Sequence, residues 1–483
     1  MRWWNGLSPD RLALPLSLAL LLAGCADGSD ARADGDATTA LVGATILDGT
    51  GGPAIDDGVL LFSTDGIECV GSRADCPVPD GAEIHNVTGR YLTPGLIDTH
   101  VHFSQTGWLD GRPDGPDLRD RYPYDELVGD LRANPDRFFA SYLCAGVTGV
   151  FDVGGFRWTI DMARDAADDP TAPHVRAAGP LISHAGREIL STGSDGSQFI
   201  MLTSPEAGRE GVRELAGLGA DAVKVWYLSP PDSIWDEIEG RFRAVADEAR
   251  SAGLLLIVHA TELRAARVAV DAGAFMLVHS VEDEAVDQEF LAFMKERGTI
   301  YAPTLLVGRN WGRAVVAAVT GDTVPEWDDP RGCVDGWTEE KLRAAPELRE
   351  LVSDEGITPE MLAAGRERGA RRREVMAANL RRVHAAGIPI VLATDAGNPL
   401  TLHGVSAHQE LAAMEAAGIP PEDLLVMATR NGARALRRPD LGTLEAGQVA
   451  DILVLSEDPR ESAAAFGALD AVIHLGVWTG RGE

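Results

Sequence analysis

The chain has few basic residues and few cysteines for its length. Its 43 lysines and arginines face 74 aspartates and glutamates, so the formal net charge is −31. This excess of negative charge argues against nucleic acid or an anionic lipid surface as a partner of the folded protein, and it is typical of a solvated acidic surface that aids solubility. The sequence also has no evident Gly-x-x-x-x-Gly-Lys nucleotide loop and no convincing serine triad, which argues against those two classes of enzyme.

Long apolar runs are scarce as well. Leu12–Gly24 is an apolar stretch of 13 residues that follows two arginines near the N-terminus. It is too short to span a bilayer comfortably and is typical of a signal-peptide core. The tetrapeptide Leu22-Ala23-Gly24-Cys25 resembles a bacterial lipobox, in which Cys25 becomes the acylated first residue. We therefore predict a lipoprotein signal peptide over 1–24, with a plain signal peptide cleaved nearby as the alternative.

The residues after Cys25 indicate where the mature protein lies. Ala26 rather than an aspartate follows the cysteine, which resembles outer-membrane retention, so we expect a periplasm-facing protein that touches the membrane only through its lipid anchor. Residues 25–39 are rich in Asp, Ala and Gly and are typical of a flexible tether. The expected partner is a small molecule, and the sequence does not determine the oligomeric state.

Export sets the expected redox state of the other cysteines. Cys69 and Cys76 bracket a turn-like stretch between two predicted strands. In an oxidising compartment a disulfide closing this hairpin is the favoured prediction, with two free thiols as the alternative. Cys144 precedes a glycine stop and is most simply a buried helix residue.

A repeated unit organises the middle of the chain. In each unit a helix ends at a glycine, a short apolar strand follows, and a polar residue closes most of the strands. Glycine is the expected left-handed stop of a helix, and strands that alternate with helices predict a parallel sheet in an α/β fold. The units begin at Gly146, Gly219, Gly253, Gly273, Gly298 and Gly387, and their strands run to Asp152, through Lys224, and to His259, His279, Pro303 and Asp395.

Length and pattern together predict two domains. An earlier strand ends on His100-Val101-His102, and eight such units predict a (β/α)8 TIM barrel over 94–437, whose strand C-termini gather at one face. Short alternating strands at 40–93 and 438–483 predict a small β-sandwich domain built from both ends of the chain. Two segments, 105–136 and 306–373, look too long for simple connections and are expected at the strand C-terminal face, as specificity loops or as surface decoration.

Two stretches resemble the amidohydrolase superfamily. Thr93-Pro94-Gly95-Leu96-Ile97-Asp98-Thr99-His100-Val101-His102 is similar to its signature, and Leu441–Val454 resembles the return strand of its sandwich domain. The order Lys, His, His, Asp along the chain resembles the imidazolonepropionase-like and Xaa-Pro dipeptidase (prolidase) branch. This resemblance, over about 40–480, implies a two-metal site, a carboxylated lysine and hydrolysis of a carbon–nitrogen bond.

The spacing of the histidines agrees with such a site. His100 and His102 lie two apart on a strand, so they face the same side and can chelate one ion. His259 and His279 are separated by one helix and one strand, so they fall at equivalent ends of neighbouring strands and can share a second ion. The full predicted ligand set is His100, His102, Lys224, His259, His279 and Asp395.

Lys224 and Asp395 have roles that the resemblance implies. A lone ammonium in the apolar strand of Lys224 is costly, and carbamylation by carbon dioxide would turn it into a bridging ligand; a lysine that extends to the barrel rim is the alternative. Two divalent ions, most simply zinc, would bridge a hydroxide that attacks the substrate carbonyl. Asp395 would bind metal and carry the proton to the departing nitrogen, whereas capping of the next helix is its structural alternative.

The prediction is an amidohydrolase that cleaves a carbon–nitrogen bond of a small substrate, such as a dipeptide or an N-acyl amino acid, and not a large-protein protease. Thr261 stands where prolidase-like members often carry a tyrosine, which leaves the dipeptide assignment open. The alternatives are a lactone, ester or cyclic-amide hydrolase with the same site, and a non-catalytic binding lipoprotein. Arg187 could hold a substrate carboxylate or lie at the surface. The predicted substrate contacts are His184, Arg187, Tyr227 and His403.

Overall fold

The structure, a computed structural model, describes residues 38–110, 116–185, 198–324, 326–352 and 358–479. The described residues group by their contacts into one compact unit. The predicted signal peptide and the lipidation site Cys25 lie outside the described residues, as does the tether apart from its last two positions. Among the helices of the described part, none is long and apolar enough to cross a membrane.

Strands from both ends of the chain share one mixed sheet. Its order is β17-β16-β15-β5-β1-β2-β3, and β4 pairs with β1. The two ends meet where Ile452 of β15 pairs with Pro94 of β5. The division of this region into the two layers of a sandwich, with domain limits at 40–93 and 438–483, stays a prediction. The strands are β1 (Thr39–Ile46), β2 (Ile55–Ser63), β3 (Gly66–Ser72), β4 (Glu83–Asn86), β5 (Tyr91–Pro94), β15 (Ile452–Leu455), β16 (Leu469–His474) and β17 (Val477–Thr479).

This sheet has an apolar core to which both ends of the chain contribute. Leu41, Leu60, Leu92 and Ile452 come from four different strands and are buried in one cluster. Burying one such side chain stabilises a fold by about 1.5–3 kcal/mol. Since Ile452 lies 360 to 411 positions from the others, the cluster ties the end of the chain to its beginning.

Nine short strands, all paired in parallel, carry the candidate site. They form a three-stranded sheet of order β6-β7-β8 and a six-stranded sheet of order β10-β9-β11-β12-β13-β14. The amide of Asp221 donates to the carbonyl of Ala177 (2.9 Å), which links the end of β8 to the start of β11. The strands are β6 (Leu96–Val101), β7 (Val147–Asp152), β8 (His174–Ala177), β9 (Leu181–Ser183), β10 (Phe199–Met201), β11 (Ala222–Trp226), β12 (Leu255–His259), β13 (Met276–Val278) and β14 (Ile300–Ala302).

Helices follow most of these strands, and the predicted glycine stops are confirmed. Gly219, Gly253, Gly273 and Gly298 directly follow α4, α5, α6 and α7, with φ values of 82°, 74°, 98° and 69°. Glycine adopts this left-handed conformation readily because it has no Cβ. The helices are α1 (Tyr124–Ala133), α2 (Asp136–Cys144), α3 (Trp158–Asp165), α4 (Pro205–Leu218), α5 (Trp235–Ala252), α6 (Leu263–Ala272), α7 (Gln288–Arg297), α8 (Val307–Thr320), α9 (Gly336–Arg343), α10 (Arg349–Val352), α11 (Pro359–Ala385), α12 (Ser406–Ala416), α13 (Pro421–Ala428) and α14 (Arg430–Ala435).

The segment predicted as the eighth barrel strand, which ends at Asp395, makes isolated bridges instead of a ladder. It touches β14 through Ile390 and β6 through Ala396. Between these bridges the carboxylate of Asp98 accepts hydrogen bonds from the backbone N–H of Thr394 (3.0 Å) and from its hydroxyl (2.5 Å). A side chain therefore replaces backbone pairing at this point, which interrupts the strand although the segment still lies between its expected neighbours.

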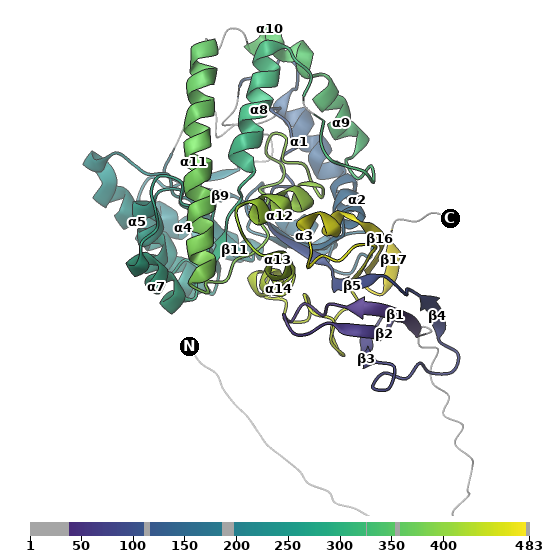
Figure 1. The fold of residues 1–483 in the computed structure, drawn as a ribbon. Helices are drawn as coiled ribbons and strands as arrows, with labels where there is room; N and C mark the ends of the chain where they lie inside the picture. The colour runs from purple at the N-terminus through teal and green to yellow at the C-terminus, as the bar shows by residue number, and fades with distance from the viewer. Residues whose placement is uncertain (1–37, 111–115, 186–197, 325, 353–357, 480–483) are drawn as a thin grey trace, which may run out of the picture. The chain divides into compact units, whose positions relative to one another are not determined.

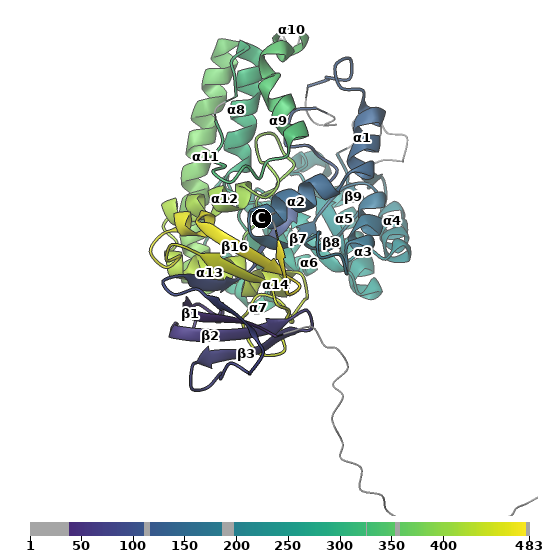
Figure 2. The ribbon, with the colours of Figure 1, turned by 90° about the vertical axis from the view of Figure 1, so that its right-hand side faces the viewer.

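The segment 306–373 is helical and not an irregular loop. It contains α8, α9, α10 and the first part of α11, and Thr358 caps α11 by accepting a hydrogen bond from the amide of Met361 (3.3 Å). Figures 1 and 2 both show α8 and α11 side by side, at the end of the unit opposite to β1, β2 and β3. The other long segment, 105–136, contains α1.

Four cysteines lie in two bonded pairs. Cys69 in β3 is joined to Cys76, the pair predicted from the sequence, with a Cα–Cα distance of 5.8 Å. Cys144, the last residue of α2, is joined to Cys333 across 189 positions, with a Cα–Cα distance of 5.5 Å. The expectation that Cys144 is only a buried helix residue is therefore wrong, because tertiary packing brings the end of α2 beside the connection between α8 and α9.

Candidate metal centre

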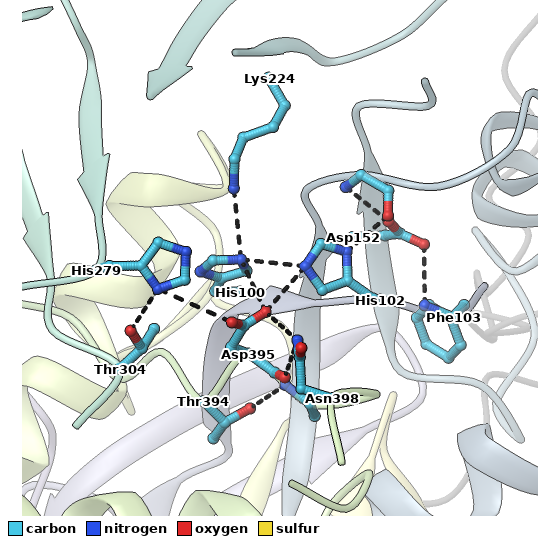
Figure 3. Close-up of polar contacts among 12 residues, drawn as sticks. His100, His102, Phe103, Asp152, Lys224, His279, Thr304, Thr394, Asp395 and Asn398 are labelled. Atoms are coloured by element: carbon cyan, nitrogen blue, oxygen red, sulfur yellow. Dashed lines mark hydrogen bonds and ion pairs between the residues drawn. The ribbon is translucent and has the colours of Figure 1, made fainter. Parts of the chain in front are cut away.

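Two histidines at the end of β6 form the first part of the site. His100 and His102 are buried and lie two positions apart, so their rings point to the same side (Figure 3). The Nδ1 of His102 is 2.6 Å from the carbonyl oxygen of Gly154. This hydrogen bond assigns the proton to Nδ1 and turns the lone pair of Nε2 toward the site. The Nε2 atoms of the two rings are 3.3 Å apart.

Asp395 faces both rings. Its Oδ1 lies 3.2 Å from Nε2 of His100 and 2.9 Å from Nε2 of His102. Its backbone N–H donates to the carbonyl of His100 (2.7 Å), and the amide of Asn398 donates to Oδ1 (2.7 Å). The φ of 65° is uncommon outside glycine and marks the sharp turn that aims the carboxylate at β6. Helix capping by Asp395 is wrong as an alternative, because α12 begins only at Ser406.

Three further predicted ligands come from neighbouring strands. Lys224 of β11 places its Nζ 3.4 Å from Nε2 of His100. The ring of His279, just after β13, lies 4.4 Å from that of His259 at the end of β12 and 4.9 Å from that of His100, measured between centroids. The hydroxyl oxygen of Thr304 is 2.7 Å from Nδ1 of His279. All six predicted ligand residues therefore line one cavity, and Figure 3 labels each of them except His259.

Burial governs the charges of these groups. It lowers the pKa of His100 and His259 well below the usual range and lowers that of His279 to about 4. It also lowers the pKa of Lys224 to about 7, against the opposing effect of nearby carboxylates. Burial would raise the pKa of Asp395, but the hydrogen bond from His102 and the positive charge of the histidines when they are protonated outweigh it and hold that pKa well below its usual range. Neutral imidazoles and an ionised carboxylate are the protonation states that metal ligands require.

The donor set fits a divalent metal ion. The ligand atoms of His100, His102 and Asp395 lie within 4.8 Å of one another, and all three residues are buried. Lone pairs crowded together away from water repel one another unless a cation lies between them. Imidazole nitrogens and a carboxylate oxygen are favourable ligands for zinc and related ions.

A second buried group, His174, Asp451 and His474, does not fit a metal. The Nδ1 of His474 is 2.8 Å from Oδ1 of Asp451, and its Nε2 is 2.8 Å from the carbonyl oxygen of Ala172. The Nε2 of His174 is 3.0 Å from Oδ2 of Asp451. Because both nitrogens of His474 are already engaged, this triad joins β8 to β15 and β16 by hydrogen bonds.

A cavity of about 480 Å³ opens onto the six predicted ligand residues. Leu181, Phe199 and Trp226 give it an apolar part, and α8 and α11 contribute a further wall. The segment 306–373 is therefore part of the site and not surface decoration. Gln105 also lines the cavity, so the beginning of the segment 105–136 reaches it too.

The residues predicted to contact substrate near β11 lie differently from expectation. Arg187 is outside the described residues. His184 is half-buried, with its ring 6.2 Å from that of Tyr227, and neither residue is in the cavity lining. The expectation for Tyr227 is wrong: its ring stacks on Phe242 of α5 at 4.6 Å. Three positions separate it from Lys224, and an odd separation on a strand turns a side chain to the opposite face.

His403 is also not in the cavity lining, which corrects the prediction that it contacts substrate. Its ring stacks on Phe138 at 3.9 Å. Its Nδ1 is 2.8 Å from the hydroxyl of Tyr142, and its Nε2 is 3.0 Å from the carbonyl oxygen of Gln105. With both nitrogens engaged, His403 holds the cavity-lining residue Gln105 in place.

Sequence reasoning missed several residues that support the ligands. Asp152 accepts hydrogen bonds from the amides of Phe103 (3.2 Å) and Gly154 (3.0 Å), which holds the carbonyl that orients His102. The buried Glu410 accepts from the amides of the two residues before α8, and burial raises its pKa to about 8. Asp152 could have been singled out from the sequence because it ends an apolar strand. No feature of the neighbouring sequence singles out Glu410.

Comparison with known protein families identifies the family of this chain. The profile of the amidohydrolase family matches residues 91–481. The chain belongs to the amidohydrolase family. It is therefore a metal-binding hydrolase of a family that acts on carbon–nitrogen bonds, and its buried His and Asp residues provide a candidate metal site.

Three relatives illustrate the similarity of this amidohydrolase to characterised proteins. It is 26% identical to the imidazolonepropionase of Rhizorhabdus wittichii over 471 residues, which cover 89% of this chain and 96% of the relative. It is 24% identical to the ochratoxinase of Aspergillus niger over 489 residues, covering 93% of this chain and 87% of that protein. A crystal structure of a Xaa-Pro dipeptidase with bound methionine matches with a TM-score of 0.68 and 21% identity, over 92% of this chain and all of the other, which shows a shared fold.

Proposed function

We propose that this protein hydrolyses the carbon–nitrogen bond of a small substrate, a dipeptide or an N-acyl amino acid, with the help of two divalent metal ions. The observation that carries the proposal is the meeting of His100, His102 and Asp395 in a buried cluster at the end of a cavity of about 480 Å³. A cavity of this size suits a small molecule and not a folded protein chain. The names of the relatives, an imidazolonepropionase and a Xaa-Pro dipeptidase, support this class of reaction.

The proposed architecture around the site is an eight-stranded barrel. Its strands are β6, β7, β8, β11, β12, β13, β14 and the interrupted segment 390–396. Support comes from the hydrogen bond between Asp221 and Ala177, which joins β8 to β11, and from the bridges of Ile390 and Ala396 to β14 and β6. In a barrel of this type the strand C-termini meet at one face, which is where the candidate ligands lie.

The metal ions, proposed to be zinc, would be held by His100, His102, His259, His279 and Asp395. Bound there, they would supply Lewis acidity to the substrate carbonyl and lower the pKa of a water molecule. Lys224 is proposed to carry a carbamate formed with carbon dioxide, because an ammonium has no lone pair for a metal. Burial favours the neutral amine, which is the form that reacts with carbon dioxide, and Nζ already faces Nε2 of His100 at 3.4 Å.

The protein side chains would then orient the reactants and move one proton. Gly154 and Thr304 fix the ring orientations of His102 and His279 through their hydrogen bonds. Asp395, whose carboxylate is held by Asn398, would accept a proton from the attacking water and deliver it to the departing nitrogen. A positioned acid–base group of this kind contributes about 100- to 10,000-fold to a rate.

The test is a hydrolysis screen on zinc-reconstituted protein that begins after Cys25. The panel contains dipeptides including Xaa-Pro, N-acyl amino acids, cyclic amides and lactones. Asp395→Asn is expected to retain metal, measured by elemental analysis, and to lose at least about 100-fold in turnover. Asp423→Asn, a half-exposed carboxylate paired with His384, is the matched control and should turn over like the wild type. Near-wild-type turnover by Asp395→Asn would contradict the proton-transfer role, and cleavage of lactones alone would replace the amidase assignment.

We also propose that the protein is exported and lipid-anchored at the outer membrane through Cys25. The apolar stretch Leu12–Gly24 and the lipobox-like tetrapeptide that ends at Cys25 support this location. Globomycin should cause the precursor to accumulate when the full chain is expressed in a Gram-negative host. An unchanged precursor band, or an unlipidated mature form of Cys25→Ser at the same membrane abundance, would contradict it.

A further inference from the structure

One face of α11 follows the cavity along several helical turns. Its lining positions are three or four residues apart, which is the spacing of neighbours on one side of a helix. They carry arginine and glycine where a helix that packs on a core would carry apolar residues. The lining residues of this helix are Gly365, Arg368, Gly369, Arg372, Arg373 and Met376.

The glycines on this face have no packing reason to be glycine. A Cβ added at Gly365 would meet nothing within 4 Å, and one added at Gly369 would meet only a guanidinium nitrogen of Arg373, at 3.2 Å. Gly308 of α8, which also lines the cavity, likewise has open space at this position. Apart from proline, glycine is the least favourable residue in a helix interior. These glycines therefore keep open the space that the cavity occupies.

The arginines on the same wall are short of negative partners. Arg372 pairs with Glu282, another lining residue, at 3.0 Å. Arg309 of α8 and Arg368 and Arg373 of α11 have no carboxylate within ion-pair distance in the part of the chain that the structure describes. In a chain with 31 more negative than positive charges, three such guanidinium groups around one cavity are a local reversal of the overall charge. A guanidinium presents paired N–H donors that match the two oxygens of a carboxylate.

We propose that this wall, formed by Arg309, Arg368 and Arg373 with the glycines between them, binds a carboxylate group at the non-reacting end of the substrate. The inference rests on the proposed function, because the same cavity contains the metal-ligand residues. It assigns the residues that bind the free carboxylate of such a substrate, and it predicts that the acid is preferred over its neutral analogue. In this proposal arginines of α8 and α11, and not Arg187, bind the carboxylate. Leu181, Phe199 and Trp226 provide apolar surface for the remainder of such a molecule.

Equilibrium binding separates this inference from the proposed reaction. The zinc-loaded Asp395→Asn protein, whose turnover is expected to be at least about 100-fold lower, is titrated by calorimetry with N-acetyl derivatives of the standard amino acids. The corresponding N-acetyl amino acid amides are titrated in the same way. The free acids are expected to bind tighter than their amides. Arg368→Gln and Arg373→Gln should each weaken the acids about three- to tenfold and leave the amides unchanged, as removal of a partly exposed charge-assisted contact does.

Arg366→Gln is the matched control, because Arg366 lies on the same helix, is exposed and does not line the cavity. It should bind acids and amides as the parent protein does. Glu282→Gln provides a change in the opposite direction: it frees Arg372 and should tighten the binding of the acids. Raising the salt concentration should reduce the difference between acids and amides, because these guanidinium groups are exposed.

The outcomes separate the carboxylate subsite from the proposed hydrolysis reaction. If no acid binds tighter than its amide, or if Arg366→Gln weakens the acids as much as Arg368→Gln and Arg373→Gln do, the inference is overturned even if amide hydrolysis is found. If the acids bind tighter and the two variants lose that preference, the carboxylate subsite stands even if the hydrolysis screen finds no turnover.

Discussion

Replacing Asp451 by asparagine is expected to lower the melting temperature by about 3 °C at neutral pH and to leave metal binding intact. The carboxylate accepts hydrogen bonds from Nε2 of His174 (3.0 Å), Nδ1 of His474 (2.8 Å) and the amide of Leu475 (3.0 Å), and all of its ring partners are buried. Asparagine keeps one oxygen, which can serve His474 and Leu475. Its amide nitrogen then faces His174, and the negative charge is lost.

The expected shift in melting temperature follows from the number of hydrogen bonds that the substitution removes. Removing one partner of a buried ion pair costs about 3–5 kcal/mol, and retention of two of the three hydrogen bonds places Asp451→Asn near the lower value, about 3 kcal/mol. Unfolding entropy is about 2.1 cal/mol/K per residue, so a cooperative unit of roughly 450 residues has about 0.9 kcal/mol/K. Dividing the two gives a shift of about 3 °C.

The pH dependence gives a second test of the same reasoning. Burial would raise the pKa of Asp451, but the two imidazoles outweigh it and hold that pKa well below the usual range. A carboxyl whose pKa is depressed by folding stabilises the protein fully above its unfolded pKa of about 3.9, and this contribution is lost as the pH falls further. The gap in melting temperature between wild type and Asp451→Asn should therefore be smaller at pH 4 than at pH 5.5.

Thermal unfolding followed by circular dichroism at several pH values is the assay. Asp423→Asn is the control, because Asp423 also bonds a histidine, His384, at 2.9 Å, but both side chains are partly exposed. Such a pair contributes at most about 1 kcal/mol, so its melting temperature should change by no more than about 1 °C. An unchanged melting temperature of Asp451→Asn, or a gap that widens at pH 4, would refute the assignment of Asp451 as the ionised centre of this triad.

Two other predictions concern covalent and backbone constraints. The double variant Cys144→Ala, Cys333→Ala should lose about 2–5 kcal/mol of stability. This loss should exceed that from removing the Cys69–Cys76 pair, because the Cys144–Cys333 bond spans 189 positions instead of 7. Peptide mapping without reduction that finds Cys144 alkylated would contradict the bond. Gly397→Ala should lower stability by about 2 kcal/mol or more and reduce bound metal, since Gly397 has a φ of 102° and its Cβ would lie 2.6 Å from the carbonyl oxygen of His102. The control Gly418→Ala has the same φ but meets only the flexible side chain of Arg381, so it should keep its metal.

Much of the candidate site could be predicted from short stretches of sequence. The strands that lead to His259 and His279 each follow a glycine stop, and His100 and His102 lie at the end of one strand. In parallel strands the carboxyl ends meet at one edge, so residues at those ends come together without further information. Helix stops and strand periodicity depend on a few neighbouring residues, and for this reason the candidate ligands can be predicted from the sequence alone.

The orientation of other side chains depended on packing that no local pattern encodes. Tyr227 and His403 lie close in sequence to candidate ligands, but their rings stack on aromatic side chains of α5 and α2 and do not line the cavity. The length and composition of 306–373 predict a loop, whereas the structure has α8, α9, α10 and the first part of α11 there. Its contribution to the cavity appears only when α8 and α11 pack together.

By itself the sequence determined the family, the alternation of helices and strands around the glycine stops, and the candidate metal-ligand residues, because these depend on local periodicity and short motifs. Only the tertiary structure decided which distant residues contact one another. The arginine and glycine wall, the bond between Cys144 and Cys333, and the partners of Asp451 join positions tens to hundreds of residues apart. Such contacts depend on how whole elements pack against one another, and local sequence carries no signal for that packing.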